Sequence, residues 1–439
     1  MNRFVNGASV NRFCLFIAFI LVGIVFIASL VSPGRAQTGG MIIEDVPGKR
    51  VPSSIIIEDN KIYQNNLVGI RIRGNLPVTI KKSQIYSNGE TGILFDTQSQ
   101  ALLSDSSLFQ NGRTSINILD ADRITIENNR IYKNPLAGVR IIGSLENEKH
   151  TLLVRIVGNR IYLNRRAGIR VMPRPVGKID LTVVGNSIYQ NETAGLRVEN
   201  NTRLTAEGNQ IHDNLGAGII VHESVIPPEF DIYRNRISFN NGEGIQIVNG
   251  ITGQIGISNN WIYGNYLSGI GIGLFHSPIS KLDNIKVMNN TIISNGSGYE
   301  GSGIRNDSQG KVIIMNNIVA YNYQTGIRTE DCGGYSYNLL YANGETGNCC
   351  ADPRSAPYRI EWEQYAGCPG REKGDLIGNP LFVDPDNYNF NLQDKSPAIG
   401  AGQDVYQDSG TSFYRNDMGA TGGPYADKIP QRPDSGRTY

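Results

Sequence analysis

Apolar and polar residues alternate in one short pattern that recurs from about residue 55 to residue 343. A clear copy is Asn60-Lys-Ile-Tyr-Gln-Asn65 followed by Gly69-Ile-Arg-Ile72. Each copy has an aliphatic residue three positions before its second Asn, and most have a Gly four positions after it. Twelve copies align on the second Asn, at spacings of 21 to 30 residues: Asn65, Asn88, Asn111, Asn134, Asn164, Asn191, Asn214, Asn240, Asn265, Asn295, Asn322 and Asn343.

This pattern predicts short β-strands joined by tight turns, because it has a period of two and places Asn and Gly between the apolar runs. A helical repeat would need apolar residues at spacings of three and four, and it would not tolerate so many Gly and Asn. A repeat of this length with three strands is typical of one coil of a right-handed parallel β-helix. We therefore expect an all-β solenoid of about 12 coils, roughly 55 to 60 Å long and capped at both ends.

Two polar columns and one aromatic column follow from the alignment. The first polar column lies five residues before the second and runs from Asn60 to Asn338. We expect the Asn side chains to bond to the next coil and to adopt the left-handed conformation at the corners, where the Gly residues add backbone freedom. The aromatic column faces outward and is expected to stabilise the stacked coils rather than to bind sugars, with His212 as a substitute among Tyr63, Tyr86, Phe109, Tyr132, Tyr162, Tyr189 and Tyr263.

The segments outside the repeats differ in composition. Residues 1–36 begin with Arg3 and Arg12 and continue with an apolar run over residues 13–31, which predicts a secretory signal. The alternative is an uncleaved membrane anchor, since the run is long enough to span a bilayer. The expected parts are a signal peptide (1–36), an N-terminal cap (37–54), the repeats (55–343), a cysteine-containing insertion (344–378), a C-terminal β-helix-associated segment (379–425) and a disordered tail (426–439).

Four cysteines near the C-terminus predict disulfide bonds. Clustered cysteines in an exported chain favour disulfides, and no His lies close enough in the sequence to favour the zinc alternative. The pairing stays open. The four are Cys332, Cys349, Cys350 and Cys368.

The C-terminal segment carries a family resemblance. Asn379-Pro-Leu-Phe-Val-Asp-Pro385, Ser396-Pro-Ala-Ile-Gly-Ala-Gly402 and Asp417-Met-Gly-Ala420 resemble the closing segment of bacterial β-helix proteins that carry a choice-of-anchor Q domain. The repeats resemble the pectate-lyase-like superfamily. This resemblance implies an exported protein, and its members include polysaccharide lyases and epimerases, but fold alone does not establish function.

A run of outward-facing arginines is the strongest candidate binding feature. In Gly-Ile-x-Ile the middle residue points away from the core, which places Arg140, Arg170 and Arg197 on consecutive coils about 4.8 Å apart. Like charges at this spacing favour an anion between them. Arg305 and Arg328 occupy the same column further on, and acidic neighbours are expected to make them a neutralised surface ladder.

Long connections after this strand bring further candidates to the same edge. We expect Arg174 and Glu199 to join the three arginines in binding a substrate. His222 and Lys178 are the candidate bases, Arg197 is the candidate for neutralising a carboxylate, and Glu199 is the candidate for orienting His222.

These residues point to an acidic, uronate-containing polysaccharide as the partner. Arg side chains suit carboxylates, and proton removal beside a carboxylate would make the protein a lyase or an epimerase. The alternative is a non-catalytic surface or periplasmic rod. The formal net charge of +1 argues against nucleic acid, and a membrane is expected only through an uncleaved N-terminal segment. We predict no cofactor and no metal site, and the oligomeric state stays open.

Overall fold

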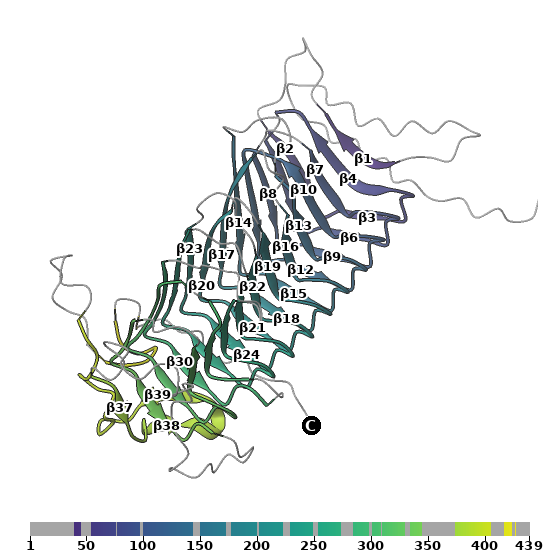
Figure 1. Cartoon of the computed structure of the whole chain (residues 1–439). Coiled ribbons are helices and arrows are strands. Elements are labelled where there is room, and N and C mark those ends of the chain that lie inside the picture. The colour runs from purple at the N-terminus through teal and green to yellow at the C-terminus, as the bar shows by residue number, and fades with distance from the viewer. Residues whose placement is uncertain are drawn as a thin grey trace, which may run out of the picture.

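Three parallel β-sheets wind around one apolar core to form a rod (Figure 1). The computed structural model describes residues 39–44, 54–75, 77–96, 100–143, 150–172, 177–199, 202–222, 229–248, 253–273, 284–297, 301–308, 310–329, 334–344, 374–404, 417–423 and 426. In this part of the chain the sheets have 12, 12 and 13 strands, and each strand pairs in parallel with its equivalents on the neighbouring coils. The predicted parallel β-helix is confirmed.

Successive strands along the chain belong to sheets B, C and A in turn. Sheet A contains β1 (Gly39–Ile43), β4 (Val68–Arg73), β7 (Ile93–Asp96), β10 (Ile116–Asp120), β13 (Val139–Ile141), β16 (Ile169–Val171), β19 (Leu196–Glu199), β22 (Ile219–His222), β25 (Ile245–Ile247), β28 (Ile270–Ile272), β31 (Ile304–Asn306) and β34 (Ile327–Thr329). Sheet B contains β2 (Ile55–Glu58), β5 (Val78–Lys81), β8 (Gln100–Ser104), β11 (Arg123–Glu127), β14 (Thr151–Val157), β17 (Lys178–Val184), β20 (Thr202–Glu207), β23 (Glu229–Tyr233), β26 (Gln254–Ser258), β29 (Ile285–Met288), β32 (Val312–Met315) and β35 (Gly334–Ser336). Sheet C contains β3 (Lys61–Tyr63), β6 (Gln84–Tyr86), β9 (Ser107–Phe109), β12 (Arg130–Tyr132), β15 (Arg160–Tyr162), β18 (Ser187–Tyr189), β21 (Gln210–His212), β24 (Arg236–Ser238), β27 (Trp261–Tyr263), β30 (Thr291–Ile293), β33 (Ile318–Ala320), β36 (Leu339–Tyr341) and β37 (Leu376–Ile377).

The core consists of the aliphatic residues that alternate along these strands. Burial follows the period of two, as in β11, where Ile124 and Ile126 are fully buried and the residues beside them are not. Equivalent residues stack from coil to coil, so Ile131, Ile161 and their counterparts form continuous apolar columns along the rod. This packing turns every other side chain outward.

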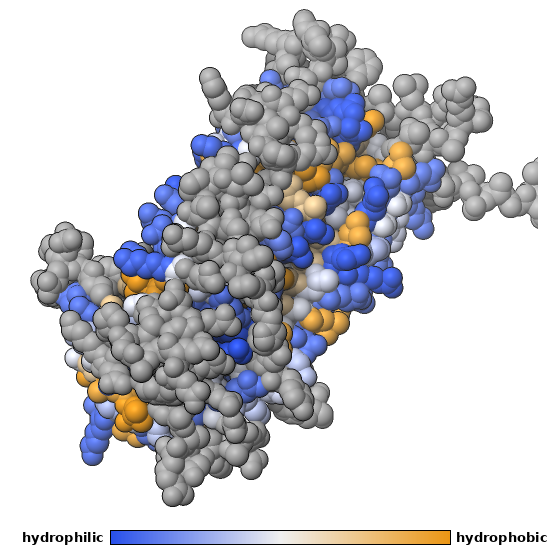
Figure 2. All heavy atoms as spheres, in the orientation of Figure 1, coloured by the Kyte–Doolittle hydropathy of each residue, from blue (hydrophilic) through white to orange (hydrophobic). Residues whose placement is uncertain are grey.

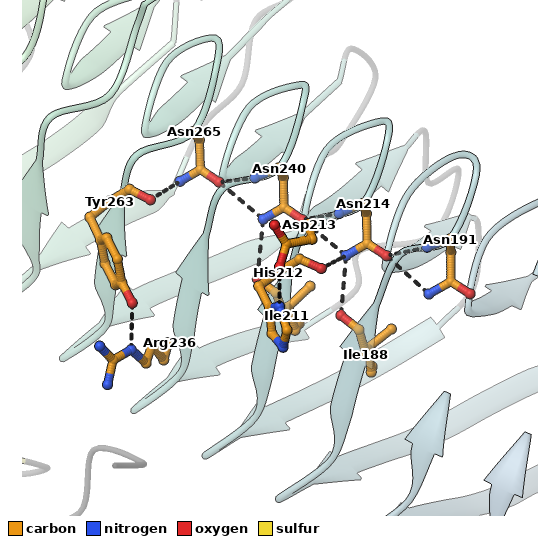
Figure 3. A network of polar contacts seen from close by, with 10 residues as sticks. All are labelled: Ile188, Asn191, Ile211, His212, Asp213, Asn214, Arg236, Asn240, Tyr263 and Asn265. Carbon is orange, nitrogen blue, oxygen red and sulfur yellow. Dashed lines mark hydrogen bonds and ion pairs between the residues drawn. The ribbon is translucent and has the colours of Figure 1, made fainter. Parts of the chain in front are cut away.

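Two ladders of buried Asn side chains join the coils at the corners between sheets, and Figure 3 shows part of the second ladder. Asn191 is representative, since its Nδ2 donates to Asn214 Oδ1 on the next coil and to the Ile161 carbonyl on the previous one. Its Oδ1 in turn accepts from Asn164. Each buried amide is thereby satisfied by backbone and by its neighbours, as expected, and the coils are held in one register.

The expected conformation of the ladder residues was wrong. The left-handed residues are those directly before the ladder Asn, such as Gln64 with φ 57° and Gln190 with φ 54°. The residue that turns the corner can therefore be of several types, because its side chain points outward. The Asn that follows it keeps an ordinary conformation, which aims its amide into the ladder.

The glycines after the second ladder were also expected for the wrong reason. Gly168 has no positive φ. A Cβ at this position would lie 2.6 Å from Ile188 Cγ2 and 2.8 Å from the Gly195 carbonyl oxygen. These positions need Gly because the coils approach each other too closely for a side chain, rather than because the backbone needs extra freedom.

The C-terminal segment covers sheet C over the last coils (Figure 1). The antiparallel strands β38 (Phe382–Asp384) and β39 (Asn389–Leu392), with the short helix η1 (Pro385–Asn387), bring Phe382 and Phe390 against Trp261 and Tyr263. Residues 417–423 add backbone acceptors for the side-chain amides of Asn259 and Asn289. At the other end of the rod, β1 pairs with β4 and extends sheet A.

Replacing one ladder residue should destabilise the rod strongly. Asn191→Asp removes two donors and places a carboxylate against two acceptors in a buried site, so we expect the free energy of unfolding to fall by about 3 kcal/mol or more. Urea unfolding followed by circular dichroism measures this. The matched control is Glu192→Gln at the next, exposed position, which should change stability by less than about 0.5 kcal/mol. Equal effects of the two substitutions would contradict the role of the ladder.

Tyr321 should make stability depend on alkaline pH. Burial, with a smaller effect of the nearby Tyr341, raises the pKa of Tyr321 from 10.0 to about 12. The folded state therefore holds this proton more tightly than the unfolded chain does. The resulting stabilisation is complete below about pH 10 and is lost as the pH rises to about 12. In Tyr321→Phe, the decrease in the free energy of unfolding between about pH 10 and 12 should be smaller by about 1 to 2 kcal/mol, and stability at pH 7 should change little. Melting temperatures from pH 8 to 12 measure this. An unchanged alkaline slope would contradict it.

Candidate functional site

The predicted arginine stripe lies on the outer face of sheet A. Arg140 on β13 pairs in register with Arg170 on β16, and Arg170 pairs with Arg197 on β19. The apolar residues on either side of each arginine are fully buried, so the three guanidinium groups lie on the outer side of the sheet. The Arg170 and Arg197 side chains are 30% and 35% exposed. The geometry of the stripe is therefore as expected, while its role stays a prediction.

Glu199 is the carboxylate that pairs with two of these arginines. Its Oε1 accepts a hydrogen bond from Arg197 Nε at 2.6 Å and lies 3.6 Å from Arg170 Nη2. Glu199 is the last residue of β19 and is mostly buried, with 19% of its side chain exposed. One negative charge thus lies between two positive charges, so among the described residues Glu199 balances one of the two arginines. A carboxylate already fits between these two guanidinium groups.

The candidate bases lie beside the stripe. His222 on β22 pairs in register with Glu199, as predicted, but no hydrogen bond joins their side chains in the described residues. Lys178 is the exposed first residue of β17 in sheet B, where the chain leaves sheet A. Arg174 lies outside the described residues. The structure therefore places His222 next to the arginines and Lys178 at the adjoining corner.

The expectation for Arg305 on the same face was wrong in one respect. Asp307 does pair with it, but Arg305 is only 4% exposed and does not lie on the surface. Its Nη2 also lies 3.1 Å from Oε1 of the buried Glu243, which is two coils away. The reason is Gly271 on the intervening strand, where a Cβ would lie 3.0 Å from that same nitrogen. Glycine at an outward position was the signal that sequence reasoning missed.

His150 has a local role at a corner between sheets A and B. Its Nε2 donates to the Ala121 carbonyl at 2.8 Å on the preceding coil. Asp120 and Asp122 carboxylate oxygens lie 3.8 and 3.7 Å from the same nitrogen. The side chain is 17% exposed, so this histidine ties the start of β14 to the corner before β11.

The aromatic column on sheet C forms a continuous stack. Ring centroids lie 4.8 to 5.1 Å apart with interplanar angles of 1° to 11° from Tyr63 to His212. The ring faces contact one another, so the rings inside the stack present only their edges and hydroxyl groups to solvent. A sugar ring cannot lie on the faces within the stack. This agrees with the expected stabilising role.

His212 at the end of this stack has a partner that the sequence reasoning missed. Its Nδ1 lies 2.7 Å from Asp213 Oδ2 (Figure 3). A carboxylate that holds one imidazole nitrogen orients the ring for proton transfer through the other. The signal was the Asp directly after the His in the sequence. Ser238 follows in the column, but it lies along the stacking direction and not in the ring plane, so it does not complete a nucleophile–base pair.

Other predicted features fall outside what the structure describes. Cys332, Cys349, Cys350 and Cys368 lie in undescribed segments, as does the apolar run over residues 13–31. Within the described ranges, no helix is long and apolar enough to span a membrane. In the same ranges, no three or more His, Cys, Asp or Glu side chains come together as a group that could hold a metal ion.

Comparisons with known proteins agree with this architecture. Residues 35–151 match the family described as "Right handed beta helix region", and residues 149–297 match the family described as "Periplasmic copper-binding protein (NosD)". The chain is similar to right-handed parallel β-helix proteins. A comparison with curated protein sequences gives no significant match.

Solved structures of β-helix enzymes are distant likenesses. The A-module of the mannuronan C-5 epimerase AlgE6 from Azotobacter vinelandii is 14% identical, with a TM-score of 0.42, over 71% of this chain and 84% of its own. Pectate lyase Pel9A is 14% identical, with a TM-score of 0.36, over 87% of this chain and 86% of its own. A double mutant of the periplasmic alginate epimerase AlgG is 13% identical, with a TM-score of 0.38, over 77% of this chain and 85% of its own.

A double-mutant cycle should show which side chain Glu199 interacts with. Because Glu199 bonds to Arg197 and not to His222, we expect a coupling energy of about 0.5 to 1 kcal/mol between Glu199→Ala and Arg197→Ala. The coupling between Glu199→Ala and His222→Ala should be close to zero. Urea unfolding of the single and double variants measures both. A larger coupling with His222 than with Arg197 would contradict the observed geometry.

Proposed function

We propose that this protein is an exported β-helix that binds a uronate-containing polysaccharide along the outer face of sheet A. The observation that carries the proposal is the register of Arg140, Arg170 and Arg197 on three consecutive strands. A polysaccharide chain presents carboxylates at regular intervals, and a rigid sheet presents guanidinium groups at regular intervals of about 4.8 Å. Matching two periodic arrays lets several weak contacts act together.

The chemistry of the stripe favours carboxylates over other anions. The guanidinium group presents two parallel donors that fit the two oxygens of a carboxylate. Glu199 supports this, because its carboxylate already occupies the space between Arg170 and Arg197. A uronate would bind the outer side of the same two groups or take the place of Glu199. The chain has 41 basic and 40 acidic residues, so the attraction is local to this face and not a property of the whole protein.

The neighbouring residues suit one class of reaction, the removal of the proton beside a uronate carboxylate. Arg170 and Arg197 would neutralise the carboxylate and make the adjacent C–H more acidic, and His222 or Lys178 would take the proton. In elimination, the electron pair forms a C=C bond while the glycosidic C–O bond breaks and its oxygen is protonated. In epimerisation, the carbanion takes a proton on the opposite face and no bond of the chain breaks.

Copper chemistry is not part of this proposal, whereas export from the cytoplasm is. The NosD description names copper, but the described residues offer no group of three suitable ligands, so we derive no step through a metal. Export to the periplasm or cell surface follows from the predicted signal over residues 1–36, and the resemblance of residues 379–425 to a choice-of-anchor Q segment extends this proposal. The competing function is a non-catalytic rod.

Removing the two arginines that share Glu199 should abolish most of the binding. We expect Arg170→Ala with Arg197→Ala to weaken retention in affinity gels that contain polygalacturonate or alginate by at least about ten-fold, since two charge-assisted contacts are lost. The matched control is Arg123→Ala with Arg155→Ala, which removes two exposed charges from sheet B and should retain binding. Adding Glu199→Gln to the first variant checks that the loss does not come from the carboxylate left behind.

The same panel of polysaccharides separates the catalytic outcomes. Ultraviolet absorbance from new C=C bonds that is absent in His222→Ala or Lys178→Ala would identify a lyase. Retention without new absorbance, with a change in uronate stereochemistry by NMR, would identify an epimerase. Binding of the double arginine variant equal to that of the parent would contradict the site, and retention on no acidic glycan would favour the non-catalytic rod.

A further inference from the structure

A second concentration of positive charge lies on sheet C, around the corner from the arginine stripe. Two consecutive stretches, residues 130–138 and 160–168, contain β12, β15 and the corners that lead from them to sheet A. Together they carry five basic residues and no acidic residue. All five basic side chains are exposed: Arg130, Lys133, Arg160, Arg165 and Arg166. We call this set the sheet C basic patch.

The patch differs from the sheet A stripe in its pairing. Arg170 and Arg197 on sheet A share Glu199. The five side chains of the sheet C basic patch form no ion pair with any carboxylate of the described residues. Arg130 and Arg160 are moreover direct register partners on adjacent strands. Two guanidinium groups at this spacing repel each other unless an anion lies between them.

The aromatic stack places hydrogen-bonding groups beside these charges. Tyr132 and Tyr162 lie in the same strands, two residues after Arg130 and Arg160, and their rings stack with centroids 5.0 Å apart. Burial raises the pKa of Tyr162, and the positive charges of Arg130 and Arg160 oppose this rise. A row of hydroxyl groups thus runs parallel to a row of guanidinium groups at the coil spacing.

In the part of the chain that the structure describes, no segment covers this face where the patch lies. The corners on either side of sheet C are short in these coils, so no long connection follows or precedes β12 or β15. The described part of the C-terminal segment covers the same sheet further along, where Tyr388 stacks on Tyr263 and its carbonyl accepts from Arg236. In Figure 2, hydrophilic residues dominate the edge of the rod along which the sheet C strands β3 to β24 lie in Figure 1.

We propose that the sheet C basic patch is a second binding surface for the same class of ligand, an extended uronate polysaccharide that runs along the rod axis. Carboxylates of the chain lie between Arg130 and Arg160, sugar hydroxyl groups bond to the tyrosine hydroxyl row, and Arg165 and Arg166 hold the chain at the corner towards sheet A. This inference rests on the proposed function for its ligand but uses different residues on a different face.

The test compares two variants that remove equal charge from the same two coils. Arg130→Gln with Arg160→Gln removes two positive charges from sheet C, and Arg123→Gln with Arg155→Gln removes two exposed positive charges from sheet B. We expect the first pair to weaken the binding of the full chain to polygalacturonate or alginate by about five-fold in isothermal titration calorimetry. The second pair should change it by less than two-fold. Circular dichroism and melting temperature should match the parent in both.

The outcomes distinguish this inference from the proposed function. The sheet C surface would be overturned if the sheet C and sheet B variants bound the polymer equally well. The sheet A site would stand in that case if the parent bound and the Arg170→Ala, Arg197→Ala variant bound more weakly. A loss confined to the sheet C variant would support the sheet C surface and contradict the sheet A site. Failure of the parent to bind either polymer would overturn both. Tighter binding of the parent to vesicles of phosphatidylglycerol than to either polymer would overturn the assigned ligand class.

Discussion

The register between coils is the constraint on which the rest of the structure depends. Parallel strands fix the spacing between coils, and the two Asn ladders fix which residue stands beside which. A buried Asn such as Asn191 satisfies its amide only when the next coil presents its own Asn at the same height. A slip of one residue would leave these amides unpaired and turn the aliphatic columns outward. Every column on the surface inherits this register.

One consequence is that charge on this protein is arranged by column and by face. On sheet A, several arginines lie close to a carboxylate. Glu199 lies between Arg170 and Arg197, and the buried Glu243 pairs with Arg305. On sheet C, Arg130 and Arg160 stand side by side with no such carboxylate in the described residues. Surface charges are usually solvated and worth little individually. Their repetition at the coil spacing is what suits them to a polymer with repeating charges.

The sequence was sufficient for the features that depend on the period of two. It predicts the fold, the inward aliphatic columns and the alignment of Arg140, Arg170 and Arg197, because each follows from which side of a strand a residue occupies. The sequence was insufficient for features that depend on the contacts between neighbouring coils. The left-handed residue lies before the ladder Asn rather than at it, and Gly168 is required by the approach of the next coil. Glu199 bonds to Arg197 and not to His222, and Arg305 extends past Gly271 to Glu243. The periodicity of the sequence does not predict which neighbour a long side chain contacts.

A crystal structure of the protein soaked with a polygalacturonate oligomer would test the central claim most directly. The account predicts that carboxylates of the oligomer lie within hydrogen-bonding distance of Arg170 and Arg197 and that the sugar chain follows the direction of the rod across β13, β16 and β19. An oligomer bound with neither arginine in contact would contradict the claim that the outer face of sheet A is the polysaccharide site.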